Sequence, residues 1–238
     1  MRSRQPQPVM AHLEELRSRL IKASLAIVAG AVVAFVFRGW IFDALVRPYE
    51  RVVLDRELAF FRPTEAFTVF MRLSLFGGFV LASPVVIWQL WAFIAPALTK
   101  RERRVVIPIV AILVVLFLGG IAFGYWSLDR GLSFLLGFGG DRLEPIIGGN
   151  EYLSFAVRFL LVFGLSFEFP VFVYAAAAVG LVGWRRLASG RRWAVLAIVT
   201  IGAVLTPSGD PLTLLLLSVP LYILYEATIW LVRFTLHR

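Results

Sequence analysis

The sequence contains no cysteine among its 238 residues, and only two residues are histidine. The absence of cysteine excludes disulfides, thiolate metal sites and cysteine nucleophiles. No H-E-x-x-H or G-x-S-x-G pattern occurs, so neither a zinc protease nor a serine hydrolase is indicated. A nucleotide-binding loop of the form G-x-x-x-x-G-K-[ST] is also missing. The chain is therefore not expected to be an enzyme, and no metal or cofactor is expected.

Charged residues are also scarce. They make up 16% of the chain, whereas 60% is hydrophobic, and the mean hydropathy is +0.84. The apolar runs reach or exceed the roughly 18 residues that mark a membrane-spanning helix, while a soluble core helix rarely needs more than about 14. The sequence therefore predicts an all-α integral membrane protein.

The few charges that exist are mostly basic, with a net charge of +9 and a pI near 10.8. Such a balance can indicate nucleic-acid binding, because basic residues release counterions from phosphate. Here most Lys and Arg stand in short clusters between apolar runs, where membrane topology and anionic lipid headgroups explain them. The basicity is therefore interpreted as a topology signal.

Six apolar stretches are predicted to span the membrane, after an amphipathic segment at 1–20 that should lie at the membrane surface. Pro84 should kink the second span, and Ser83 beside it can bond a carbonyl that the proline frees. Pro170 should interrupt the fourth. The fifth and sixth spans are short, the fifth with only about 13 apolar residues against a hydrocarbon core of roughly 30 Å. The predicted spans of this single domain, 1–238, are 21–37, 68–93, 105–126, 153–179, 193–205 and 212–231.

The connections between the spans indicate the topology. Basic clusters at the N-terminus, at 100–104, at 185–192 and at the C-terminus place both termini in the cytoplasm by the positive-inside rule. The first outer loop, 38–65, also carries five arginines, which weakens this assignment. A short apolar face in that loop is expected to end where Pro48 breaks it. A second outer loop is expected at 128–150.

Three carboxylates are expected to face the cytoplasm: Glu14 and Glu15 in the N-terminal segment and Glu102 in a basic run. A carboxylate is the natural acceptor of a guanidinium, because it takes two parallel charge-assisted hydrogen bonds. A simpler interpretation is that Glu14 pairs with Arg17 and Glu15 with Arg19 along one helix, for a few tenths of a kcal/mol each. The spacing alone leaves both interpretations open.

Glu168 lies near the middle of the fourth predicted span, between two phenylalanines and just before Pro170. An ionisable group at that depth costs several kcal/mol unless it is protonated, hydrated or partnered, so it is a functional candidate. The alternative is a neutral, hydrogen-bonded glutamate that packs the bundle. Glu226, about two turns before Arg233, is expected to face a hydrated hollow.

Several short motifs follow one another along nearly the whole chain, and together they resemble a known family. The motifs are His12-Leu13-Glu14-Glu15-Leu16-Arg17, Ser83-Pro84, Trp91-Ala92-Phe93-Ile94-Ala95-Pro96-Ala97-Leu98, Lys100-Arg101-Glu102-Arg103-Arg104, Gly164-Leu165-Ser166-Phe167-Glu168-Phe169-Pro170, and Thr206-Pro207 with Asp210. The chain resembles the TatC family, the multispanning component of the twin-arginine protein translocase.

The resemblance implies a cup-shaped bundle of six helices in the cell membrane. Its cytoplasmic face would bind the twin-arginine signal peptides of folded proteins. It also implies assembly with single-span TatA- or TatB-like subunits, a homo-oligomer in the receptor complex, and export driven by the transmembrane proton gradient. None of this follows from composition or spacing.

The resemblance also assigns roles to particular residues. Glu15 and Glu102 match acids that engage the paired arginines, and the same region is lined by His12, Leu16, Arg17 and Phe93. Glu168 matches an intramembrane acid that faces the cavity, while Thr206 and Asp210 match the outer junction where partner subunits dock. Leu214 stands where the family often has glutamine, so one polar partner contact is expected to differ. The structural residues are Pro48, which matches a position in the periplasmic cap, Pro84 and Pro96.

Two other classes of membrane protein compete with this interpretation. A small secondary transporter or proton-coupled channel would use Glu168 as a relay between proline-interrupted helices. That class predicts an internal repeat, and the first three spans show no convincing similarity to the last three. An intramembrane enzyme would need a nucleophile and base that the sequence does not provide.

Overall fold

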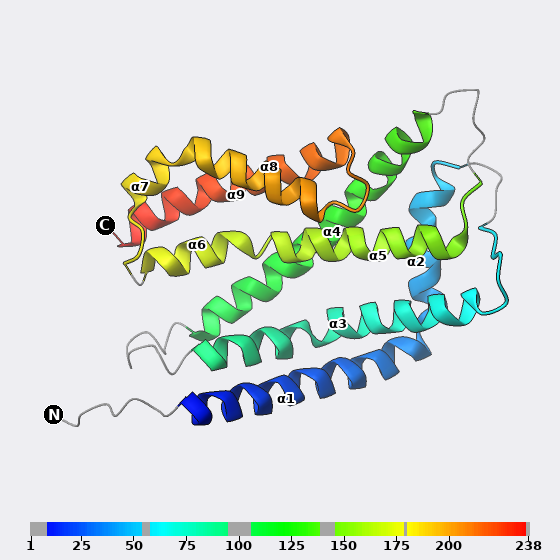
Figure 1. Ribbon diagram of the computed structural model, residues 1–238, viewed down its shortest axis with the longest axis horizontal. Coiled ribbons are helices and arrows are strands. Elements are labelled where there is room, and N and C mark those ends of the chain that lie inside the picture. Colours follow the sequence, from blue (N-terminus) through cyan, green and yellow to red (C-terminus); the bar gives the residue numbers. More distant parts are fainter. Residues whose placement is uncertain (1–8, 54–57, 95–105, 139–145, 179, 237–238) are drawn as a thin grey trace. The chain divides into compact units, whose positions relative to one another are not determined.

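The computed structural model describes residues 9–53, 58–94, 106–138, 146–178 and 180–236 (Figure 1). Within these ranges the regular secondary structure consists of helices, and the one β feature is an isolated bridge between Ala59 and Gly148. The all-α prediction is confirmed for this part of the chain. The helices are α1 (Val9–Val36), α2 (Arg38–Glu50), α3 (Glu65–Ile94), α4 (Val106–Gly137), α5 (Gly149–Ser166), α6 (Phe169–Ala178), α7 (Trp184–Ser189), α8 (Arg191–Leu205) and α9 (Pro211–Leu236).

Five helical segments in the described ranges are long and apolar enough to cross a membrane, which makes this a multi-pass membrane protein. Helix α8 is the exception, because its 15 residues reach only about 22 Å at 1.5 Å per residue. The prediction that the fifth span is short is confirmed, but the prediction that the sixth is short is wrong, because α9 continues as one helix of 26 residues from Pro211 to Leu236. The five segments are Leu13–Val36, Glu65–Phe93, Ile109–Gly137, Gly149–Ala178 and Pro211–Leu236.

The chain forms two compact units, of which the first comprises Met1–Ile41 and Phe70–Val114. In this unit α1 lies beside α3, and the two backbones touch at glycines (Figure 1). A Cβ added at Gly30 would lie 2.7 Å from the carbonyl oxygen of Gly78, and one added at Gly78 would meet the backbone of Ala31. Only glycine permits this approach, which is how apolar helices gain contact area in a membrane.

The second unit comprises Phe42–Val69 and Val115–Arg238. Here α6, α7 and α8 pack against α9 (Figure 1). Helix α4 crosses α5 at another pair of glycines, since a Cβ at Gly120 would lie 2.6 Å from the carbonyl oxygen of Phe163, and one at Gly164 would lie 2.8 Å from the ring of Phe117. Buried aromatic rings fill this crossing, with Phe159 and Phe163 stacked at 4.7 Å.

The prolines behave in three different ways. Pro170 interrupts the fourth span as predicted, because α5 ends at Ser166 and α6 begins at Phe169. Pro84 lies inside α3, and the hydroxyl of Ser83 donates to the carbonyl of Val80 at 2.8 Å, as predicted for a carbonyl that has lost its helical donor. Pro48 was predicted to break its segment, and that is wrong: α2 passes through Pro48 to Glu50.

Two predicted boundaries are also wrong. No helix boundary separates the segment 1–20 from the first span, because α1 runs unbroken from Val9 and meets no proline or glycine before Gly30. The second outer loop does not begin at residue 128, because α4 continues to Gly137. Leu128 and Leu132 are buried there, and their packing against the rest of the unit keeps the glycine-containing end of α4 helical.

Candidate functional site

The N-terminal candidates lie on the exposed part of α1. The carboxylate of Glu15 accepts two hydrogen bonds from the guanidinium of Arg19, from Nε at 2.9 Å and from Nη2 at 2.6 Å. Leu16 and Arg17 are exposed, and the side chain of His12 lies outside the described residues. The helical pair predicted for Glu15 is therefore present, and a partly exposed pair of this kind contributes only a few tenths of a kcal/mol.

The remaining candidates for the same region are only partly described. Phe93 is half-buried near the end of α3. Glu102 and Pro96 lie outside the described residues, so the structure does not test whether Glu15 and Glu102 meet. Their shared role stays a prediction.

Glu168 lies in the break between α5 and α6. Its backbone N–H donates to the carbonyl of Leu165 at 3.2 Å, and its own carbonyl accepts from Val171 at 3.1 Å. The side chain is buried, 8% exposed, and neither carboxylate oxygen has a hydrogen-bond partner among the described residues. Within that part of the chain, the hydrogen-bonded packing role therefore finds no support.

Asp210 begins α9 as its N-cap. One carboxylate oxygen accepts the backbone N–H of Thr213 at 2.8 Å and the other accepts the hydroxyl of Ser208, while Pro211 occupies the first helical position. Burial opposes ionisation of this carboxyl, but the hydrogen bonds from Ser208 and Thr213 outweigh it and hold its pKa below the usual value. Asp210 therefore stabilises the turn between α8 and α9 as a charged cap.

Thr206 ends α8 at the other side of this turn. It is buried, and its hydroxyl has no hydrogen-bond partner among the described residues. Leu214, at the place where the family often has glutamine, packs against Gly202. A Cβ added at Gly202 would lie 2.9 Å from the Leu214 side chain. The structure thus brings Thr206 and Asp210 into one turn, and no described hydrogen bond or ion pair joins that turn to Glu168.

An apolar groove of about 250 Å³ runs between the α5–α6 break, α8 and α9. Ser166 and Phe169, on either side of Glu168 in the sequence, belong to its lining, but Glu168 itself does not. The groove therefore offers an apolar surface beside a buried acid. The other lining residues are Leu165, Phe172, Ala197, Ile198, Ile201, Gly202, Leu205, Leu217 and Leu221.

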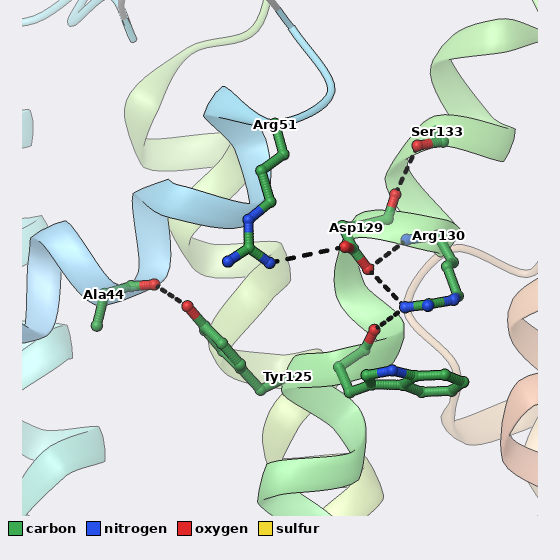
Figure 2. A network of polar contacts seen from close by, with 7 residues as sticks. Ala44, Arg51, Tyr125, Asp129, Arg130 and Ser133 are labelled. Atoms are coloured by element: carbon green, nitrogen blue, oxygen red, sulfur yellow. Dashed lines mark hydrogen bonds and ion pairs between the residues drawn. The ribbon is translucent and has the colours of Figure 1, made fainter.

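Two tyrosines, which the sequence did not single out, donate to carbonyls of α2, and one of them explains how this helix tolerates Pro48. A proline removes the donor for the carbonyl four residues earlier, here Ala44. The hydroxyl of Tyr125 donates to that carbonyl at 2.8 Å (Figure 2), and the hydroxyl of Tyr152 donates to the next one, Leu45, at 2.6 Å. Helices α4 and α5 thereby hold α2, and a proline within an otherwise helical pattern would have been the signal to look for such donors.

Figure 2 also shows a charged cluster on α4, close to the α2 contact. Asp129 lies 3.8 Å from the guanidinium of Arg51 and 3.2 Å from that of Arg130. The Arg130 guanidinium stacks over the ring of Trp126 at 3.8 Å from its centroid. These exposed pairs contribute little energy individually, so the tyrosine hydrogen bonds are the stronger link to α2.

Glu226 has a partner that the sequence did not indicate. Arg191 of α8 donates Nε and Nη2 to its two carboxylate oxygens, at 2.5 and 2.9 Å, and the hydroxyl of Tyr222 donates to it at 2.9 Å. Glu226 therefore forms a bidentate ion pair between α8 and α9, and the hydrated hollow expected around it stays a prediction. The sequence separation of 35 between the partners hid the pair from any local pattern.

The chemistry available in these places is recognition by charge and hydrogen bonding. Within the described ranges, no group of three or more His, Cys, Asp or Glu residues is arranged to hold a metal ion. The described candidates are carboxylates, guanidinium groups and buried hydroxyls, which can form ion pairs and hydrogen bonds.

Known proteins resemble the chain over nearly its whole length. The family model "Sec-independent protein translocase protein (TatC)" matches residues 11–220. The TatC protein of Carboxydothermus hydrogenoformans is 36% identical over 230 residues, covering 96% of this chain and 94% of its own. That of Aquifex aeolicus is 37% identical, covering 94% of each. A crystal structure described as a twin-arginine translocase receptor, TatC, superposes with a TM-score of 0.81 at 36% identity, covering 93% of this chain and 99% of that one.

Proposed function

The chain belongs to the TatC family of Sec-independent protein translocases, and from that premise we propose that it is the receptor for twin-arginine signal peptides. The observation that carries the proposal is the pair formed by Glu15 and Arg19. The guanidinium of Arg19 donates twice to one carboxylate on the exposed part of α1. It occupies, within the chain, the place that an arginine of a signal peptide would take.

The energies favour such an exchange. The internal pair contributes only a few tenths of a kcal/mol, so displacing Arg19 costs little. An incoming arginine can likewise donate two N–H groups from its planar guanidinium to the carboxylate, which the ammonium group of lysine cannot reproduce. Glu102 would receive the second arginine, and the side chains that line the region would be His12, Leu16, Arg17 and Phe93.

The proposal is tested by removing the internal competitor. We expect Arg19→Gln to raise the affinity for a twin-arginine signal peptide by about twofold, because Glu15 no longer has to release Arg19. The peptide with two lysines should gain less. Titration of the purified chain with both peptides measures this, and Lys22→Gln on the same helix is the control for loss of one positive charge. An equal gain for both peptides, or an equal gain in the control, would leave only general electrostatics.

We also propose six spans within one domain, 1–238, in the cell membrane with both termini in the cytoplasm. Helix α8 is the additional short span, joined to α9 by the turn at Asp210 and by the ion pair of Arg191 with Glu226. Because α8 reaches only about 22 Å, the bilayer must thin around it or its ends must lie inside the membrane.

The absence of cysteine makes this topology directly testable. In single-cysteine variants, Ser189→Cys before α8 should react with a membrane-impermeant maleimide only from the cytoplasmic side. Pro207→Cys after α8 should react only from the outer side. Both residues are exposed. Labelling of both from the same side would reduce the spans to five.

The partners follow from the same premise. We propose that single-span TatA- or TatB-like subunits dock at the turn of Thr206 and Asp210 and along the apolar groove, with Glu168 as the buried acid available to them. The receptor complex would contain several copies of this chain. The chain has no nucleotide-binding loop and acts in binding and not as an enzyme, so the energy for export would come from the transmembrane proton gradient.

A further inference from the structure

A basic and aromatic corner lies where α7, the start of α8 and the end of α9 meet (Figure 1). Its five arginines are exposed, and Glu226 is the one acidic residue between positions 180 and 205 or 211 and 236. The five positive charges less one negative charge leave the corner at +4. We call this surface the arginine corner; its arginines are Arg185, Arg186, Arg191, Arg192 and Arg233.

The backbone of the corner is fixed by contacts between helices. The hydroxyl of Tyr225 donates to the carbonyl of Leu187 at 2.9 Å and so attaches α7 to α9. The bidentate pair of Arg191 with Glu226 attaches α8 to α9 and neutralises the one carboxylate. Within the described residues of these three helices, no acid is left to balance the charges of Arg185, Arg186 and Arg192.

Indole rings hold two of the arginines. The guanidinium of Arg233 lies over Trp184 at 5.0 Å and over Trp230 at 5.4 Å, measured to the ring centroids, and that of Arg185 lies 5.5 Å from the Trp184 centroid. A guanidinium stacked on a ring keeps its N–H edge for an acceptor, and its fork geometry matches the oxygens of a phosphate. The stacking prepares the corner for an anion.

The surroundings of the corner are apolar. Trp193 is 75% exposed, Trp230 50% and Phe234 65%. Exposed tryptophans next to arginines are typical of the depth where lipid headgroups begin. A soluble anion would leave these rings without a partner, whereas a phospholipid offers a phosphate to the arginines and acyl chains to the rings.

We propose that the arginine corner is a binding site for an anionic phospholipid, with the headgroup phosphate on Arg185, Arg186 and Arg192 and the acyl chains against Trp193 and Phe234. The lipid bridges α7, α8 and α9. It therefore stabilises the short α8 on α9.

The test uses the full chain in neutral detergent micelles, titrated with phosphatidylglycerol or with phosphatidylcholine of the same acyl chains. The midpoint of thermal unfolding is followed against lipid concentration. The patch variant carries Arg185→Gln, Arg186→Gln and Arg192→Gln. The control variant removes three exposed arginines elsewhere, with Arg47→Gln, Arg62→Gln and Arg158→Gln. Glycerol phosphate, added alone, represents a soluble anion.

We expect phosphatidylglycerol to raise the midpoint more than phosphatidylcholine does. An arginine near an anionic lipid surface contributes about fivefold in affinity, so the patch variant should lose at least about tenfold and Arg192→Gln alone about fivefold. The control variant should keep the wild-type affinity. The proposal is overturned if the control loses as much as the patch variant, if the patch variant and Arg192→Gln bind as the wild type does, or if glycerol phosphate gives the same stabilisation.

Discussion

Replacing Glu168 with glutamine is expected to slow export by about tenfold or more, which corresponds to an increase of about 1.4 kcal/mol in the activation free energy. The affinity for the signal peptide should stay at the wild-type value. The side chain is 8% exposed, and neither carboxylate oxygen has a partner among the described residues. An acid kept inside a span at a cost of several kcal/mol is available to a partner that arrives during transport. The rate of export of a folded reporter, in cells with this chain as their sole TatC, measures the effect.

Glu65 provides the matched control, because it is also 8% exposed but accepts the backbone N–H of Phe61 at 3.0 Å. Glu65→Leu leaves that N–H unpaired and should lower the free energy of unfolding by about 1–3 kcal/mol. Glu168→Leu removes a buried group with no described partner and should not lower it. If Glu168→Leu destabilises the chain as much as Glu65→Leu does, and Glu168→Gln exports normally, the residue is structural packing.

Removing the Tyr125 hydroxyl is expected to lower the free energy of unfolding by about 1–3 kcal/mol in the wild type and by much less in Pro48→Ala. In the wild type Tyr125→Phe leaves the carbonyl of Ala44 without its donor. An alanine at position 48 restores the helical N–H for that carbonyl. Unfolding of the four proteins of this double-mutant cycle gives the coupling energy.

Tyr152→Phe is the control that distinguishes this explanation from a general destabilisation of α2. The Tyr152 hydroxyl donates to Leu45, whose helical donor is residue 49 and is not removed by Pro48. Tyr152→Phe should therefore cost the same with proline or alanine at position 48. Strict additivity for Tyr125 and Pro48 would show that the hydroxyl does not replace the donor that the proline lacks.

The parts of the fold that the sequence predicts are those that local chemistry decides. The short fifth span follows from its short apolar run, the break before Pro170 from its missing N–H, and the bond of Ser83 from the carbonyl that Pro84 frees. The continuity of α2 through Pro48 could not be predicted, because the donors lie 81 and 107 residues away from their acceptors. The extension of α4 likewise depends on the burial of Leu128 and Leu132 by other helices.

In the candidate site, too, interactions within one helix could be predicted and interactions between helices could not. The spacing predicts the pair of Glu15 with Arg19, because both lie on one helix. The pair of Glu226 with Arg191 joins two helices and left no local pattern. For Glu168 the sequence shows only its apolar neighbours and its depth in the span, and the structure adds that its carboxylate has no hydrogen-bond partner among the described residues.

Carboxylates of this chain are proposed to distinguish the guanidinium group of arginine from other positively charged groups. This claim is tested most directly by binding of the detergent-purified chain to a twin-arginine signal peptide and to the same peptide with two lysines, each with wild type and Glu102→Gln. We expect the wild type to prefer arginine by about tenfold, as for a charge-assisted hydrogen bond of about 1.5 kcal/mol, and the variant to lose that preference. Equal binding of both peptides to the wild type at moderate salt, or no binding at all, would contradict the claim.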